Sequence, residues 1–393
     1  MMYTVTKNTK LISYILMAVG VLAIIFGFTN DAHRAWPSLM INNYFFLAIS
    51  AFAIFFVALQ YVSEAAWAIP FKRVAEGITS YFLVGGIIML FIIVAGKLHW
   101  NHIWHWMAEG IMDPNDDHYD AIIAGKEGYL NFPFFFIRAA VYIFGWWYAA
   151  KRLIALSRRE DTEGGLSSYK ASITLSAVFI VFFGYTSSMM AWDWIMSIDT
   201  HWFSTLFGWF VFSSMGVTGF TMIAMVAIVL KRKGYLEQVN ENHIHDLGKW
   251  IFAFSILWTY MWFSQFMLIW YSNIPEEVTY YMARWEHYNA LFWITSVINF
   301  IFPLLILMSR DSKRNFGYIM TVGVIVLIGH WCNVFLLIEP GIMKDHWHIG
   351  FTEIGMFAGF LGLFLFIVNR ALTKAPLFVK NHPFADESIH HHI

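Results

Sequence analysis

Long apolar stretches separated by short polar ones are the main pattern along this chain. Ten stretches are each close to the length of about 20 residues that a helix needs to cross the hydrocarbon core of a bilayer. They are continuously apolar and lack the two-residue alternation of a transmembrane β-barrel, so the pattern predicts helices. The predicted segments are 11–29, 40–62, 77–96, 132–150, 170–190, 205–230, 250–271, 287–308, 317–338 and 350–369.

The composition supports a membrane protein. The chain of 393 residues is 59% hydrophobic and 13% charged, whereas a soluble domain carries about 25% charged residues. We therefore predict an all-α integral membrane protein with about ten transmembrane helices, forming a single polytopic membrane domain over residues 1–393.

The positive charges are distributed unequally between the two sides of the predicted helices. Nineteen of the 25 Lys and Arg residues fall on the side of the N-terminus, five fall on the other side, and Arg138 lies inside a segment. Because cytoplasmic loops are enriched in Lys and Arg, the N-terminal side is predicted to be cytoplasmic. Ten crossings then place the C-terminus there too, with residues 376–393 as a polar, extended cytoplasmic tail.

Charge and cysteine content exclude several functions. The net charge of −1 gives no electrostatic footprint for nucleic acid. The single cysteine, Cys332, excludes a cysteine-ligated iron–sulfur cluster and a C-x-x-C-H haem attachment within this chain. No metal site and no covalently bound cofactor are assigned.

Polar and ionisable residues inside membrane helices are costly and are treated as functional candidates. Most of them fall in the halves of the helices away from the cytoplasm, whereas Glu64 is the candidate near the cytoplasmic edge. His330 and Asn333 share a helix face because they are three residues apart. The outer candidates for a quinol site or a proton pathway are Arg138, Gln265, His287, His330, Asn333, Glu339 and Glu353.

An imidazole beside a carboxylate can accept and pass a proton near neutral pH, which is the chemistry that a quinol head group requires. Two other uses of the histidines stay open. A buried histidine also bridges membrane helices by hydrogen bonding alone, and His287 and His330 are the pair available for a bis-histidine haem. No residue is assigned as catalytic.

The outer connector between the fifth and sixth segments carries the most distinctive string. Asp193, Asp199 and His201 stand among three tryptophans there. They form either an aromatic belt with a capped helix start or an acidic lip that carries protons outward. The long outer loop at 97–131 is also rich in Trp and His, and an interfacial helix is expected across Trp100–Ile111.

The string SSMMAWDWIMSIDTHWFSTLFGWFVFSSM, at Ser187–Met215, resembles the quinol-dehydrogenase membrane subunits of bacterial alternative complex III. These belong to the NrfD/polysulfide-reductase membrane family, and the length of this chain is most similar to that of the second, smaller NrfD-like subunit. The resemblance covers essentially the whole chain. Only Asp193, Asp199 and His201 are carried over from the shared string as site candidates.

The resemblance implies two four-helix bundles, formed by helices two to five (about 40–190) and six to nine (about 205–338), with one peripheral helix on either side. It implies a subunit of a quinol:cytochrome c oxidoreductase in the bacterial inner membrane that is not catalytic alone. Menaquinol is the implied substrate, and haems and iron–sulfur clusters are implied in the partner subunits. The implied partners are the sister NrfD-like subunit, an iron–sulfur protein, c-type cytochromes, a terminal oxidase and lipids.

Two alternatives belong to other classes. A secondary transporter is compatible with ten helices, and Gly85-Gly86 and Pro303 are its candidate helix breaks. The other alternative is a purely structural anchor for peripheral redox proteins.

Overall fold

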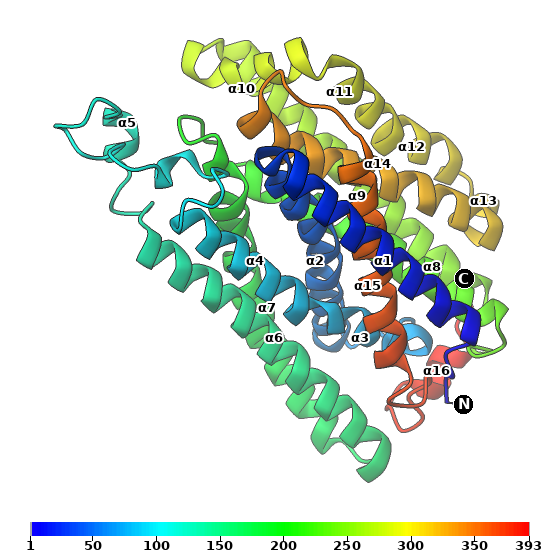
Figure 1. Ribbon diagram of the computed structural model, residues 1–393. Coiled ribbons are helices and arrows are strands. Elements are labelled where there is room, and N and C mark those ends of the chain that lie inside the picture. The colour runs from blue at the N-terminus through cyan, green and yellow to red at the C-terminus, as the bar shows by residue number, and fades with distance from the viewer. Residues whose placement is uncertain (1, 393) are drawn as a thin grey trace.

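The computed structural model describes residues 2–392, which form an assembly of long, roughly aligned helices (Figure 1). Among these residues there is no strand, only one isolated bridge between Met2 and Pro376. Met1 and Ile393, at the ends of the predicted domain and tail, lie outside the described residues.

Ten spans in the described part of the chain are long and apolar enough to cross a membrane, as predicted. They are α1 (Lys7–Asn30), α2 (Ala32–Val62), α3 and α4 (Lys72–Ile78, Phe82–Lys97), α6 (Phe132–Glu163), α7 (Ser167–Trp194), α8 (Phe207–Arg232), α9 (Glu241–Ser272), α11 and α12 (Asn289–Ser296, Phe302–Leu307), α14 (Phe316–Met343) and α15 (Phe351–Leu372). The shorter elements are η1 (Ile69–Phe71), η2 (Thr79–Tyr81), η3 (His105–Met107), α5 (Ala121–Ala124), η4 (Met196–Ile198), α10 (Pro275–His287), the π-helical η5 (Val297–Ile301), α13 (Arg310–Arg314) and α16 (Ala385–Ile389).

Helix α2 is the centre of the molecule. Nearly all of its residues from Arg34 to Ala58 are buried, and it packs against α4, α7, α8, α14 and α15. Its Phe52 ring contacts aromatic rings of α8 and α9. Helices α4, α6 and α7 lie on one side of this contact network, and α8, α9, α12 and α14 form the other group.

The first and last spans pack against each other. A Cβ atom built on Gly20 of α1 would lie 2.3 Å from the Cα atom of Gly359 on α15, so the two backbones are in direct contact. Figure 1 shows α1 and α15 side by side. The expectation of one peripheral helix on either side is therefore wrong, because small residues let these two helices pair closely.

The eighth span is not a regular helix. It passes from α11 through the π-helical turn η5 into α12, which has Pro303 in its first turn. Asn299, inside the π-helical turn, is fully buried, and within residues 2–392 neither of its side-chain polar atoms has a hydrogen-bond partner. Single π-helical turns inside α-helices often occur at functional sites.

Both termini lie at one end of the helices, which we call the terminal face. The Tyr3 hydroxyl donates to Asn369 Oδ1 at 2.7 Å, and the tail folds back with Val379 and Ser388 fully buried. The expectation of an extended tail is wrong, because its apolar residues and histidines find partners on the helix ends. The opposite end, the distal face, is formed by residues 98–131, 195–206, 273–288 and 344–350.

The predicted interfacial helix over Trp100–Ile111 is also wrong. Only the short turn η3 forms there. His99 has a φ of +56°, which ends the preceding helix, and the Asn101 side chain accepts from the Ile103 amide at 3.3 Å. A side chain that bonds to its own backbone competes with helix formation.

Candidate functional site at the distal face

The distal face contains a cavity of ≈ 640 Å³, which we call the distal cavity. Five imidazoles, one carboxylate and two cationic side chains line it, together with backbone and apolar groups. Those eight residues are His33, His102, His105, Asp199, His201, Arg284, His287 and Lys344. They come from the start of α2, the 98–131 loop, the 195–206 connector, α10 and the segment after α14, so the tertiary fold brings five separate segments together.

Asp199 and Arg284 form the charged pair of this cavity. Arg284 Nη2 donates to Asp199 Oδ2 at 3.2 Å, while Nε donates to the carbonyl of Leu336 at 3.0 Å. The guanidinium lies 3.3 Å from the centre of the Tyr280 ring, which stacks on Trp202 at 3.9 Å. The Asp199 side chain keeps 28% of its surface exposed. It is therefore held in place on one side and accessible on the other.

Burial raises the pKa of Tyr280 to about 12. The phenol therefore stays protonated in the physiological range and contributes an aromatic wall rather than a base. Neither Tyr280 nor Arg284 was identified from the sequence, because nearly all of α10 was left in a connector outside the predicted segments and Arg284 was counted only as an outer cation.

His201 lines the distal cavity, and 52% of its side-chain surface is exposed. Its Nε2 is 2.6 Å from Asp120 Oδ2, and the Asp120 side chain caps α5 through the amides of Ile122 and Ile123. The pKa of Asp120 lies below its usual range, mainly because the Ile123 amide donates to its carboxylate. His201 and the Ile122 amide lower the pKa further, and together these groups outweigh the effect of burial, which raises it. The imidazole is therefore beside a carboxylate, the arrangement that favours proton exchange.

His287 lies outside the eighth span. It is the last residue of α10, its side chain is exposed, and it lines the distal cavity. The expected position inside a membrane segment is wrong, because α10 is a separate helix whose end at Tyr288 breaks the apparent continuity. His287 and His330 lie in different environments: His287 lines the distal cavity, whereas His330 is fully buried beside Ser214 and is absent from that lining.

Arg138 and Asp193 form a buried ion pair between α6 and α7. Arg138 donates from Nε and Nη2 to the two carboxylate oxygens at 2.8 and 2.9 Å, and the Tyr142 hydroxyl donates to Oδ2 at 2.8 Å. Asp193 is fully buried. The two hydrogen bonds from Arg138 on α6 to Asp193 on α7 therefore join the two helices.

His330 and Asn333 share a face of α14, as their spacing predicts. His330 Nδ1 is 2.9 Å from the Ser214 hydroxyl of α8, and Asn333 donates to the same hydroxyl at 3.4 Å. His330 is fully buried and its Nε2 atom has no partner in the described structure. Asn333 also borders a small cavity of ≈ 30 Å³ with Gln265 and Thr295, which is large enough to hold a water molecule.

Glu339 and Glu353 are both fully buried near the distal end. Glu353 is fixed: Arg34 Nη2 donates to it at 2.5 Å, the Ser38 hydroxyl donates at 2.9 Å, and it caps the start of α15. Both carboxylate oxygens of Glu339 lack a hydrogen-bond partner in the described structure. Glu339 is thus a buried acid without a hydrogen bond to the described chain. Such a group is unusual unless the carboxylate binds a proton or a water molecule.

Gln265 and Glu64 are the remaining predicted candidates, and neither lines the distal cavity. Gln265 on α9 donates to the Tyr281 hydroxyl at 3.1 Å and accepts from Ser204 at 3.2 Å, so it joins α9 to the distal segments. Glu64 follows the end of α2, is exposed and has a φ of +49°. It lies at the terminal edge, as predicted.

A buried charged group at the terminal face was missed. The terminal cluster consists of Lys72, Arg73, Glu76, Glu160 and Asp161. The expectation that buried ionisable groups favour the distal half is therefore wrong. Lys72 and Arg73 were counted as loop cations, but they begin α3 inside the third span and are almost completely buried.

The ten apolar spans and their interior contacts define an all-α, multi-pass membrane protein. Within residues 2–392, no group of three or more His, Cys, Asp or Glu side chains is placed to hold a metal ion. Neither family models nor curated proteins match the sequence of this chain.

Proposed function

We propose that the chain is a membrane subunit of a quinol:electron-acceptor oxidoreductase complex and that the distal cavity binds the quinol head group. The observation that carries this proposal is the combination of size and chemistry in that cavity. It offers ≈ 640 Å³ beside one accessible carboxylate and five imidazoles, and apolar side chains such as Ile103, Ile198 and Ile342 complete its lining. The resemblance of Ser187–Met215 to the NrfD-like subunits of alternative complex III favours the same function.

In this proposal the distal face is periplasmic and both termini are cytoplasmic. The unequal distribution of Lys and Arg supports that orientation. The contacts among α2, α4, α6 and α7, and among α8, α9, α12 and α14, support two four-helix bundles. The complex would lie in a bacterial inner membrane with a sister membrane subunit, an iron–sulfur protein and c-type cytochromes.

Oxidation of one quinol to quinone releases two protons and two electrons. Asp199 and His201 are the groups that accept the protons, because both are accessible and each is oriented by a fixed neighbour. Arg284 positions the Asp199 carboxylate. The electrons leave to iron–sulfur or haem centres of the partner subunits, which are the electron acceptors that the reaction requires.

Replacing Asp199 by Asn tests this function in the purified complex. The amide keeps the size of the side chain but cannot take a proton, so we expect turnover with quinol to fall about 10²-fold or more. Asp117→Asn, on the exposed 98–131 loop, is the matched control. An assembled Asp199→Asn complex with unchanged turnover would refute the proton-accepting role and favour a purely structural anchor.

Transport is the second candidate, and the interrupted eighth span is the observation that favours it. Transporters place their substrate sites at broken helices near the middle of the membrane, and Asn299 in η5 is buried next to Gly329, which precedes His330. Uptake of a solute by the chain alone in liposomes would support transport. Quinol oxidation by the assembled complex that depends on Asp199 would favour the first function.

A further inference from the structure

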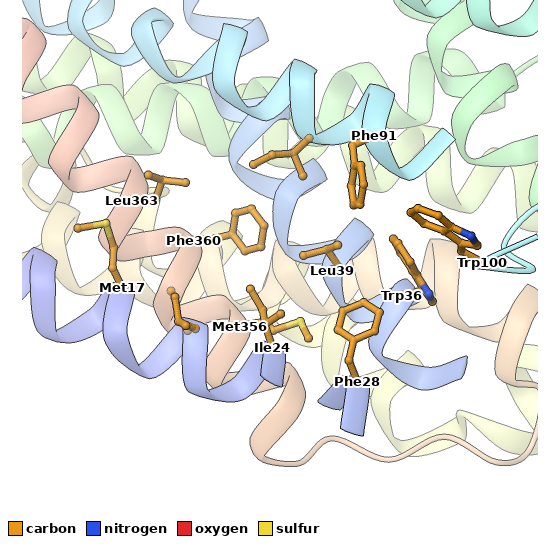
Figure 2. A pocket seen from close by; sticks show the side chains of 14 residues that line it. Met17, Ile24, Phe28, Trp36, Leu39, Phe91, Trp100, Met356, Phe360 and Leu363 are labelled. Atoms are coloured by element: carbon orange, nitrogen blue, oxygen red, sulfur yellow. The ribbon is translucent and has the colours of Figure 1, made fainter. Parts of the chain in front are cut away.

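An apolar groove of ≈ 610 Å³ runs along the membrane-facing side of α1, α2, α4 and α15. Every residue that lines it is apolar. Figure 2 shows Met17 and Leu363 towards one end and Trp36 and Trp100 towards the other. Val21 and Trp100 keep 55% and 60% of their surface exposed, so the groove is open to its surroundings at these two positions.

Close contact between two helices forms the floor of the groove. Gly20 and Gly359 both line it, and they are the residues at which the backbones of α1 and α15 touch. Because neither has a side chain, the crossing leaves a depression that no part of the described chain fills. Met17 and Met356 border the depression with flexible thioethers that adapt to an irregular ligand.

The length of the groove matches one leaflet. On α1 its lining runs from Met17 to Phe28, and eleven steps at 1.5 Å give about 16 Å along the helix. Half of a hydrocarbon core of about 30 Å is about 15 Å. Phe28 is close to the distal end of α1, so the groove spans the distal leaflet.

The groove and the distal cavity adjoin the same two segments. Near the start of α2, His33 lines the cavity and Trp36 lines the groove. In the 98–131 loop, which follows α4, His102 lines the cavity and Trp100 lines the groove. Three residues along a helix are about 4.5 Å of rise. The mouth of the apolar groove therefore opens beside the wall of the polar cavity at two independent points.

We propose that the groove holds the polyisoprenoid chain of the quinol whose head group enters the distal cavity, an inference that rests on the proposed function. Since lipid tails are as apolar as the groove, transfer from the bilayer contributes little. The role of the groove is instead to fit the chain closely and to keep the head group near Asp199.

The chemistry of the cavity favours a quinol over a phospholipid. A phosphate headgroup is best recognised by unpaired Lys or Arg side chains. Of the two cations in the cavity, Arg284 is already bonded to Asp199, and the remaining polar lining is mainly imidazole. Imidazoles suit hydroxyl groups that must be bound and deprotonated.

Filling the groove with an indole tests the inference in the purified complex. Val21→Trp places the ring in the groove, whereas Val181→Trp, at a position of α7 that is 76% exposed and away from the groove, is the matched control. For a long-chain quinol, we expect Val21→Trp to raise KM about tenfold, equivalent to about 1.4 kcal/mol. Neither variant is expected to change turnover with a tail-less quinol.

The outcomes separate the two proposals. A wild-type complex that oxidises neither quinol would refute the proposed function. A wild-type complex that oxidises both, with Val21→Trp affecting both equally or neither, would refute the groove inference alone. In a second measurement, a photoreactive polyisoprenoid quinone should label peptides that contain Met17 or Met356, and Val21→Trp should suppress the labelling. Labelling by a photoreactive phospholipid but not by the quinone would overturn the inference.

Discussion

Two aspartates six residues apart have opposite environments. Asp193 is fully buried and receives two hydrogen bonds from Arg138 and one from Tyr142. Asp199 receives a single bond from Arg284 and is partly exposed in the distal cavity. The same functional group therefore has two environments: the Asp193 carboxylate is held by a bidentate guanidinium pair, which is a strong and geometrically specific interaction, whereas Asp199 keeps part of its surface free.

We predict that Asp193→Asn destabilises the protein without a specific effect on chemistry. The change leaves the Arg138 charge buried without its counter-ion, which costs about 3–5 kcal/mol. Thermal unfolding of the complex in detergent should show a clear decrease in Tm, whereas Asp117→Asn on the exposed loop should leave it unchanged. An unchanged Tm combined with lost turnover would instead give Asp193 a place in the proton pathway.

The residue types of the site could be predicted from the sequence, but their pairing could not. Asp193, Asp199 and His201 stand out among tryptophans in one short string. Their partners Arg138, Arg284 and Asp120 lie 55, 85 and 81 residues away. Helix periodicity places residues on faces only within one element, so a contact between elements depends on packing that a single sequence does not specify.

At the scale of elements, glycine determines how the outermost helices pack. The Gly20–Gly359 contact allows backbone-to-backbone approach, and Ala23 lies against Gly355 one turn further along. Lipid offers no hydrophobic force for pairing helices, so close packing at small residues is what stabilises α1 on α15. The glycines of the first and last segments indicate in the sequence that each helix can pack closely against another, but they do not specify that these two helices are partners.

We predict that Gly359→Leu separates α1 from α15 and destabilises the protein by about 1–3 kcal/mol, because the new side chain meets backbone that cannot move aside. Gly184 on α7 is the matched control, since a Cβ atom there meets nothing within 4 Å in the described part of the chain. Gly184→Leu should be neutral or slightly stabilising, as glycine is a poor helix former. Comparing thermal unfolding of the two variants checks the prediction, and equal stability would contradict it.

The length of the apolar stretches identified the ten spans, because the thickness of the bilayer sets that length. It did not locate the helix ends. Helix α6 continues to Glu163 and α9 starts at Glu241, well outside the predicted ranges. Arg, Lys and Glu are good helix formers, so a helix that contains them continues where the hydrocarbon stops. The helix α10 was missed for the opposite reason: its polar and aromatic residues carry little apolar signal, although Pro275 and the first-turn acids mark a helix start.

At the scale of the whole molecule, the C-terminal tail closes the terminal face over a buried cluster. His382 is 8% exposed. Its Nε2 lies 4.0 Å from Glu160 Oε1, and its ring packs edge-on against Tyr169 at 5.2 Å. Asn381 donates to the carbonyl of Asp161 at 2.9 Å. The tail therefore covers the terminal ends of α6 and α7, although the sequence predicted it to be extended.

Burial, reinforced by the positive charge of Lys72, lowers the pKa of His382 to about 3. An ordinary imidazole titrates near 6.5, so between these two values the detached tail binds a proton that the docked tail does not. Attachment of the tail is therefore complete above about pH 6.5 and weakens as the pH falls towards 3. The loss is about 1.4 kcal/mol per pH unit, or about 2 kcal/mol at pH 5.

We predict that acidification from pH 7.5 to 5 exposes the tail to hydrogen exchange. His382→Phe keeps an aromatic ring beside Tyr169 but cannot bind a proton, so the protection of its tail should depend much less on pH. His390→Phe, at an exposed position, should respond like the unmodified chain. If the tail of the unmodified chain stays equally protected at both pH values, burial of a neutral His382 does not control its attachment. The tail would then be held chiefly by its other contacts, such as the pair between His391 and Asp246 at 2.7 Å.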